Sequence, residues 1–302
     1  MPLFRRCDGE LVTDLSDVRR MMPYLMPRRN DSVVYHAMQM KVSKASAWIR
    51  EYNRHRPRRE HATLFHLGLC VCAKLLHDRP GVNRFVSGGR IYQRKGVWIS
   101  FVAKKLLADG APFVTIKLPF PKDEPFGECV QRVTNAVLEG RSDRELPIDS
   151  EVRILTRLPG PILRLIITAA RWLDRLNVLP AALIEPDPMF TSLFAANLGS
   201  ISGSNAFHHL YEYGTCSLFA VMGEVRKTVF VDKGGALDVS DVLDVQWTFD
   251  ERVNDGYYVL KTLAIGQQLF ENPEQWIHLP NALKESGVRG ADASDNAVLP
   301  QA

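Results

Sequence analysis

The stretch at residues 246–276, QWTFDERVNDGYYVLKTLAIGQQLFENPEQW, constrains the fold more than any other part of the chain. An apolar run typical of a strand enters a short charged segment, D-E-R-V-N-D-G, and apolar residues then recur at helical spacing. The pattern predicts a strand, a tight turn and an amphipathic helix. A chain of 302 residues is long enough for one large α/β domain or two small ones.

Strand and helix patterns follow each other along the rest of the sequence. Helices are expected at 14–26 with Asp14 or Ser16 as cap, from about Ser43 to 55, and at 61–79, 124–141 and 161–179. The expected strands lie in 32–42, 83–107 with a Gly88–Gly89 turn, 111–120, 187–202 and 215–232. Residues 281–302 are polar and lack periodicity, and we interpret them as a disordered tail.

Composition excludes several classes of protein. A net charge of +4 is too small to indicate nucleic-acid binding. The five cysteines fit neither a disulfide framework nor a zinc site, so free thiols in a reducing compartment and no metal are expected. The first residues lack an apolar signal region, and the sequence contains no run of about 18 apolar residues. We therefore expect a cytoplasmic protein.

Three segments in order resemble the catalytic domain of dihydrolipoamide acyltransferases, the core of 2-oxoacid dehydrogenase complexes, related in fold to chloramphenicol acetyltransferase. The segment LGLCVCAKLLHDRPGVNRFVSGGRIY resembles the family's helix, P-x-x-N and strand. The segment AANLGSISGSNAFHHLYEYGTCSLFAVMGEV resembles its S-N-L-G-x-x-G strand and the strand after it. The segment FDERVNDGYYVLKTLAIGQQLFENPEQW resembles D-H-R-x-x-D-G and the helix that ends in E-N-P. The resemblance covers roughly residues 15 to 280.

The resemblance implies a two-layer α/β sandwich in which a mixed β-sheet is flanked by helices. It implies one catalytic domain over residues 1–280, with an N-terminal arm at about 1–30 and a helical insertion at about 151–185. It also implies a homotrimer or a multiple of three, with active sites between subunits that coenzyme A and the acyl acceptor enter from opposite ends. In the family a histidine takes the acceptor's proton and a hydroxyl side chain stabilises the oxyanion.

Both of these chemical groups differ in this chain. Glu251 stands where the family has its histidine, and Ala196 stands where it has its serine. A carboxylate near its reference pKa of about 4.3 is a weaker base than histidine, near 6.5. Loss of one oxyanion donor typically costs a factor of 10²–10³ in rate. Arg252 is expected to keep a nearby carboxylate ionised.

Other candidate residues surround these two positions. By the resemblance, Asp255 is mainly structural and pairs with an arginine, here Arg19 or Arg20. The substrate-binding candidates are Ala196, Asn197, Gly199 and Ser202, and Ser192, Ser200 or Ser202 replaces the missing hydroxyl only if the register shifts. His208 and His209 are either a relocated base or ordinary polar residues at a turn or subunit contact.

The helix at 161–179 admits two interpretations. Arg164, Arg171 and Arg175 share one face and the rest is almost wholly apolar, so the expected arrangement is a core-packed helix with a solvated arginine stripe. The alternative is a helix that lines an acyl-chain tunnel or lies on a membrane surface.

Three functions remain open from the sequence. The first is a divergent coenzyme A-dependent acyltransferase acting on acyl-CoA. The second is a catalytically inactive scaffold, a pseudoenzyme that keeps a trimeric or cage assembly. The third is a module that binds acyl-CoA or a hydrophobic ligand. Participation in a dehydrogenase complex would require acyl-carrier or dehydrogenase partners supplied by other chains.

Overall fold

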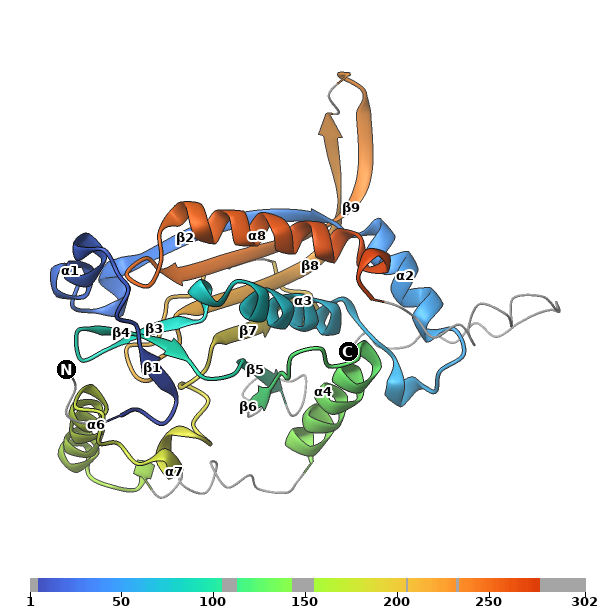
Figure 1. Cartoon of the computed structure of the whole chain (residues 1–302). Helices are drawn as coiled ribbons and strands as arrows, with labels where there is room; N and C mark the ends of the chain where they lie inside the picture. The colour runs from blue at the N-terminus through green and yellow to red at the C-terminus, as the bar shows by residue number, and fades with distance from the viewer. Residues whose placement is uncertain (1–4, 105–112, 143–154, 205, 232–233, 278–302) are drawn as a thin grey trace.

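The computed structural model describes residues 5–104, 113–142, 155–204, 206–231 and 234–277. The tail predicted at 281–302 lies outside the described residues. The chain forms a mixed α/β structure with one six-stranded sheet and one three-stranded sheet, as Figure 1 shows. The predicted fold class, a mixed sheet flanked by helices, is confirmed.

The six-stranded sheet has the order β2-β9-β8-β7-β5-β6. Strand β7 runs parallel to both of its neighbours, and the remaining pairs are antiparallel, so the sheet is mixed. The bounds are β2 (Val33–Lys41), β5 (Trp98–Lys104), β6 (Phe113–Pro119), β7 (Leu193–Asn197), β8 (Leu218–Val231) and β9 (Leu237–Asp250).

A small antiparallel sheet lies beside the large one, in the order β1-β4-β3. Its strands are β1 (Gly9–Leu11), β3 (Arg84–Ser87) and β4 (Arg90–Arg94). The predicted Gly88–Gly89 turn joins β3 to β4, and both glycines have positive φ, at 57° and 73°. A Cβ on Gly88 would also lie 2.3 Å from the carbonyl oxygen of Arg175, so this turn requires glycine.

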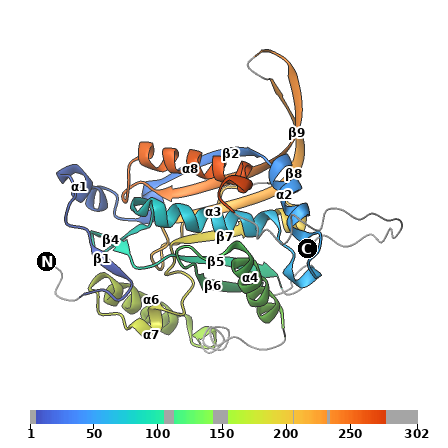
Figure 2. The same ribbon diagram turned by 45° about the vertical axis from the view of Figure 1, so that its right-hand side comes forward.

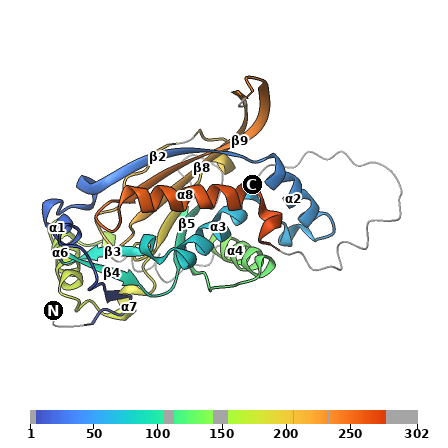
Figure 3. The same ribbon diagram turned by 45° about the horizontal axis from the view of Figure 1, so that its top comes forward.

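Four helices supply the apolar layer that packs on one face of the large sheet. They are α2 (Ser43–Asn53), α3 (Leu64–Asp78), α4 (Phe126–Arg141) and α8 (Gly256–Glu271). Figures 2 and 3 show α3 and α8 lying along the sheet, with α4 and α2 toward one end. The main core lies between this layer and the inward side chains of the strands, among them Ile99, Ala220 and Val245.

The opposite face of the sheet is covered in part by the chain that leads into β8. A second apolar cluster there contains Phe194, Leu210, Cys216, Phe219 and Val221. The sequence predicted strand structure in this stretch, from residue 215. Residues 206–217 contain no strand in the described structure, and β8 begins only at Leu218.

Strands β8 and β9 extend beyond the sheet as a two-stranded hairpin, which projects from the body in Figures 1 to 3. Its outer part carries exposed apolar residues, namely Val229, Val231, Leu237 and Val239. Two ion pairs lie nearby, Lys227 with Asp241 inside the hairpin and Lys41 of β2 with Asp238. The described part of the hairpin therefore combines exposed apolar residues with paired charges.

Helix α6 (Gly160–Arg175) corrects the expectation that residues 161–179 form a core-packed helix. None of its residues, all of which are described, is buried, and it lies at the edge of the molecule with α7 (Ala181–Ile184). The helix ends at Arg175 rather than at Pro180, because Asn177 adopts a left-handed backbone with φ of 62°. The apolar pattern was correct, but the surface that it faces is not the core of this chain.

Helix α3 begins with a capping box in which a histidine replaces the usual acidic residue. The Thr63 hydroxyl accepts a hydrogen bond from the backbone NH of His66 at 3.4 Å, and the backbone NH of Thr63 donates to Nδ1 of His66 at 3.2 Å. Burial lowers the pKa of His66 from 6.5 to about 4. The His66 ring is therefore neutral at neutral pH, and its Nδ1 atom can accept the hydrogen bond from the backbone NH of Thr63.

We expect His66 to make the protein acid-sensitive. The unfolded chain takes up a proton at His66 near pH 6.5, whereas the native protein does so only near pH 4. The unfolded state therefore binds more protons in this window, and the free energy of unfolding should fall by about 3 kcal/mol as the pH decreases through it. Between pH 7 and pH 5 about 2 kcal/mol of this loss should appear, and urea unfolding of the wild type and of His66→Gln at the two pH values measures it. An identical pH slope in the two proteins would contradict the assignment.

Candidate active site at the turn before α8

The turn between β9 and α8 is organised by a buried ion pair. Asp250 is fully buried and Arg252 is 2% exposed. Nε of Arg252 donates to Oδ1 of Asp250 at 2.9 Å, and Nη2 donates to Oδ2 at 2.7 Å. The backbone NH of Arg252 also donates to Oδ1, at 3.0 Å. The carboxylate that Arg252 contacts is therefore that of Asp250.

Two residues that the sequence did not single out complete this network. The Ser32 hydroxyl donates to Oδ1 of Asp250 at 3.0 Å. Arg29, in η1 (Arg29–Ser32), is also buried, and its Nε lies 3.9 Å from Oδ2 of Asp250. Its other guanidinium nitrogens donate to the carbonyls of Tyr211 and Gly214. Nothing in the spacing of PRRNDS predicts these contacts, because they span more than 180 residues of sequence.

Glu251 is half-buried and projects from this network. Its backbone is held on both sides, because its NH donates to the carbonyl of Ser32 at 2.9 Å and its carbonyl accepts from Nη1 of Arg19 at 2.5 Å. Its carboxylate forms no hydrogen bond or ion pair with any residue in the described part of the chain. The turn therefore fixes the backbone of Glu251 and leaves its carboxylate without a partner.

Asp255 does not pair with Arg19 or Arg20, contrary to expectation. Its carboxylate accepts from the backbone NH of Tyr258 at 2.8 Å and caps the N-terminus of α8. Arg19 instead bonds the carbonyls of Glu251 and Arg252, and Arg20 bonds the carbonyl of Thr13. Asp255 is exposed and shapes the end of the turn.

Ala196 and its neighbours form a second group at the end of β7. Ala196 packs against the apolar cluster on the second face of the sheet. Asn197 ends β7, and its carbonyl accepts from the Ser200 hydroxyl at 2.8 Å. A Cβ on Gly199 would lie 2.5 Å from the carbonyl oxygen of Gly223, so the loop turns back closely over β8.

The three serines considered as replacements for the missing hydroxyl have other positions or partners. Ser192 is buried, and its hydroxyl accepts from the backbone NH of Trp98 at 3.0 Å. Ser200 bonds the carbonyl of Asn197, while Ser202 is exposed in a left-handed conformation with φ of 52°. Ser192 thus precedes β7, and Ser200 and Ser202 follow its other end.

The strand register separates Ala196 from Glu251 within one chain. Ala196 lies opposite Val221 on β8, and Val221 lies opposite Gln246 on β9. Glu251 follows Gln246 by five residues (246 to 251), which is about 17 Å along a strand, and β7 is two strands away, a further distance of about 10 Å across the sheet. One copy of the chain therefore does not bring the two positions together.

His208 and His209 lie on the second face, beside the sheet. The ring of His208 stacks on Phe219 at 4.0 Å between centroids and on His209 at 4.7 Å. Burial lowers the pKa of His208. Its carbonyl accepts from the Thr248 hydroxyl at 2.6 Å, which places the histidine pair about 10 Å along β9 from Glu251.

A cavity of about 310 Å³ adjoins the turn. It lies between α6, the β3–β4 turn and residues 212–214, and α1 (Asp17–Leu25) contributes Pro23 and Tyr24 to its wall. Its charged lining residues are Arg29, Arg171, Arg175, Arg252, Asp174 and Glu212. The arginines outnumber the acidic residues, so the cavity favours an anionic group.

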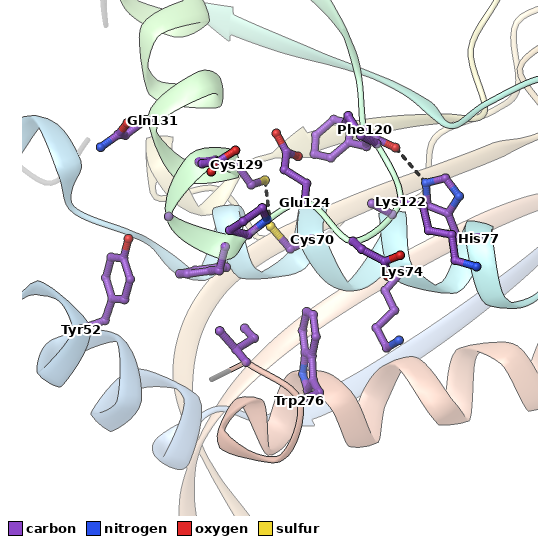
Figure 4. Close-up of a pocket in the computed structure, with 18 of the residues that line it drawn as sticks. Tyr52, Cys70, Lys74, His77, Phe120, Lys122, Glu124, Cys129, Gln131 and Trp276 are labelled. Atoms are coloured by element: carbon purple, nitrogen blue, oxygen red, sulfur yellow. Dashed lines mark hydrogen bonds between the residues drawn. The ribbon is translucent and has the colours of Figure 1, made fainter. Parts of the chain in front are cut away.

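A larger cavity, of about 610 Å³, lies at the other end of α8 (Figure 4). Lys74, His77, Lys122 and Glu124 line it with the aromatic residues Tyr52, Phe120 and Trp276, and the sulfur atoms of Cys70 and Cys129 lie 2.8 Å apart in its wall. Trp276 follows the C-terminus of α8, and the 16 residues of that helix span about 24 Å. No sequence pattern indicates this cavity, because four separate segments form it. It does not belong to the Glu251 turn.

Comparisons with known proteins identify the fold. No protein-family model matches the chain, and no curated protein matches it in sequence. Among solved structures, the dihydrolipoamide acetyltransferase of Azotobacter vinelandii is similar with a TM-score of 0.56 and 15% identity over 85% of this chain and 90% of the other. A chloramphenicol acetyltransferase is similar with a TM-score of 0.52 and 9% identity over 87% of this chain and 98% of the other.

A third similar structure is the cubic core of a pyruvate dehydrogenase multienzyme complex. It has a TM-score of 0.54 and 13% identity over 85% of this chain and 90% of the other. The chain thus has the chloramphenicol acetyltransferase-like fold of dihydrolipoamide acyltransferase catalytic cores, and the similarity inferred from three short segments is confirmed at the level of fold.

Proposed function

We propose that this protein is a divergent coenzyme A-dependent acyltransferase in which Glu251 acts as the general base. The observation that carries the proposal is the unpartnered carboxylate of Glu251 on a turn whose backbone is fixed by Ser32, Arg19 and the Asp250–Arg252 ion pair. A base must be held in place and yet be free to accept a proton. The turn meets both conditions.

In the proposed reaction, the Glu251 carboxylate accepts the proton of the acceptor's thiol, hydroxyl or amine group. The acceptor atom attacks the thioester carbonyl carbon and forms a tetrahedral intermediate. The intermediate collapses, the carbon–sulfur bond breaks, and the acyl group stays on the acceptor. The proton on Glu251 then passes to the departing coenzyme A thiolate, which restores the carboxylate. No oxidant or reductant is required.

The arginines of the 310 Å³ cavity support an anionic substrate such as acyl-CoA. Arg171 and Arg175 form no hydrogen bond or ion pair with residues that the structure describes, so their charges are available to phosphate groups. Arginine is well suited to phosphate because its guanidinium donates two parallel hydrogen bonds. The cavity lies beside the turn that carries Glu251.

We propose that the complete site forms between copies of the chain. The strand register keeps Ala196 and Asn197 far from Glu251 in one copy, so a second copy would have to bring the β7 loop to the turn. The similar cubic core supports a homotrimer or a multiple of three. The exposed pair Tyr35 and Phe207, with centroids 5.3 Å apart, provides apolar surface for such a contact on the second face.

Light scattering tests this assembly. We expect the mass of three chains, or of a multiple of three, at micromolar concentration. A paired change of Tyr35→Glu and Phe207→Glu should dissociate it, because burying two carboxylates in an apolar contact is costly. The matched control is Val229→Glu on the projecting hairpin, which should leave the mass unchanged. A wild-type protein that stays monomeric would contradict the proposed site between copies.

A catalytically inactive scaffold is the second candidate function, and Ala196 favours it. The side chain at this position is a methyl group packed in an apolar cluster, so it offers no hydrogen-bond donor to an oxyanion. Partners in such an assembly would be acyl-carrier or dehydrogenase chains.

Assay with a panel of acyl-CoA thioesters separates the two candidates. The thioesters should range from acetyl to long-chain, each with thiol, amine and alcohol acceptors. Release of coenzyme A, with acylated acceptor identified by mass spectrometry, supports the enzyme. An intact assembly that transfers no acyl group from any member of the panel would overturn the enzyme proposal in favour of the scaffold.

A further inference from the structure

Helix α6 presents a continuous apolar face to solvent. Residues at positions 162, 165, 166, 172, 173 and 176 recur at helical spacing and lie on one side. They are Ile162, Leu165, Ile166, Trp172, Leu173 and Leu176, and all are exposed, with Leu165 at 68% and Trp172 at 57%. Val178 and Leu183 extend the apolar surface beyond the helix. A patch of this kind on a folded protein indicates a contact surface.

The opposite side of α6 is anchored to the body of the protein, which fixes the apolar face outward. Nη2 of Arg6 lies 2.7 Å from the Asp174 carboxylate, and the Ser87 hydroxyl donates to the same carboxylate at 2.9 Å. Nη1 of Arg6 also donates to the carbonyl of Asp174, at 3.0 Å. Arg6 is buried, so the charge of Asp174 is neutralised within the protein.

The charge that α6 leaves exposed is all positive. Arg164, Arg171 and Arg175 follow one side of the helix beside the apolar face, and Arg171 and Arg175 also line the 310 Å³ cavity. No hydrogen bond or ion pair joins these three arginines to any described residue. The only acidic residue of α6 is Asp174, which faces inward. An apolar stripe bordered by unpaired cations is complementary to an anionic bilayer, whose acyl region takes up the apolar residues while its phosphates bind the arginines.

The projecting β8–β9 hairpin provides a comparison. Beside its exposed apolar residues, Lys227 is paired with Asp241, and Asp238 is paired with Lys41 of β2. Such a surface is suited to another protein chain. The charge of α6 instead favours a surface that is uniformly negative.

The dimensions of α6 define how it would contact lipid. Its 16 residues span about 24 Å, which is shorter than a hydrocarbon core of about 30 Å. No helix within the described residues is long and apolar enough to cross a membrane. An amphipathic helix that binds a bilayer without crossing it lies in the plane of the interface, with its axis parallel to the bilayer.

We propose that the outward face of α6 docks on the surface of a bilayer that contains anionic phospholipids. The apolar residues would enter the boundary between headgroups and acyl chains, while Arg164 and Arg175 would lie at the level of the phosphates. Membrane docking would leave α6 between the bilayer and the 310 Å³ cavity, because Ala170 and Asp174 of the cavity lining lie on the anchored side of the helix. The inference rests on α6 and does not require the proposed reaction.

Sedimentation with vesicles tests the proposal on the full-length protein. We expect the wild type to bind phosphatidylcholine vesicles that contain phosphatidylserine at least about 10-fold more tightly than vesicles of phosphatidylcholine alone, and to lose this preference at high salt. The double change Arg164→Glu and Arg175→Glu should abolish the preference. The double change Leu165→Glu and Trp172→Glu should reduce binding to the mixed vesicles about 10-fold or more.

Val229→Glu on the hairpin is the matched control and should bind like the wild type. All of these side chains are exposed, so the melting temperature should be unchanged, and circular dichroism verifies that the variants fold. Equal binding by the wild type and the Leu165→Glu and Trp172→Glu variant would overturn the proposal. The proposal would also be overturned if the wild type bound neither vesicle and the Leu165→Glu and Trp172→Glu variant lost its assembly. That result would assign the face to a second copy of the chain.

Discussion

Replacing Asp250 with asparagine should lower the free energy of unfolding by about 3–5 kcal/mol, because it leaves the buried guanidinium of Arg252 without its counter-charge. Asp250 is fully buried and accepts from Ser32 and from three nitrogens of Arg252. The amide of asparagine keeps the size of the side chain and one acceptor oxygen. The fall in the free energy of unfolding is therefore caused by the lost charge and not by a change in volume. Arg29, 3.9 Å away, adds a second buried cation to the uncompensated group.

Urea unfolding followed by tryptophan fluorescence measures this loss. Asp238→Asn is the matched control, since Asp238 forms an ion pair with Lys41 at 2.7 Å but half of its side chain is exposed. Exposed pairs contribute about 0–1 kcal/mol, so the control should change little. If Asp250→Asn also changed the stability by less than about 1 kcal/mol, the network would not be what holds the turn.

The local elements of the fold could be predicted from the sequence. The helix expected at 61–79 has apolar residues at helical spacing and a proline after its end, and α3 occupies Leu64–Asp78. The strand, turn and helix of residues 246–276 appear as β9, the Glu251 turn and α8. Each of these patterns depends on residues that are close in the sequence, which is why they could be recognised.

Features that depend on distant residues could not be predicted. Asp255 caps α8, and Arg19 of α1 donates to the carbonyl of Glu251 instead of pairing with Asp255. The spacing of these residues in the sequence does not indicate which partner Arg19 contacts. The apolar pattern of α6 could be recognised in the sequence. Apolar residues at helical spacing, however, do not show whether they pack in the core of the chain or contact a partner. The 610 Å³ cavity is missing from the sequence analysis for the same reason, since its lining residues come from four segments.

The second large effect concerns Glu251. Glu251→Gln keeps the shape of the side chain and removes its ability to take a proton, so turnover should fall by about 100-fold or more, the usual contribution of a general base. Stability should hardly change, because the carboxylate has no bond to lose among the described residues, and the backbone contacts to Ser32 and Arg19 remain. Asp255→Asn is the matched control, since asparagine also caps a helix and turnover should stay close to that of the wild type.

The most direct test of the proposed mechanism is therefore the rate of coenzyme A release per folded chain in the wild type and in Glu251→Gln, with the melting temperature of both measured in parallel. The proposed mechanism predicts a fall of about 100-fold or more in the variant at an unchanged melting temperature. Full turnover in Glu251→Gln would contradict it, and so would a loss of turnover that only follows a loss of folded protein.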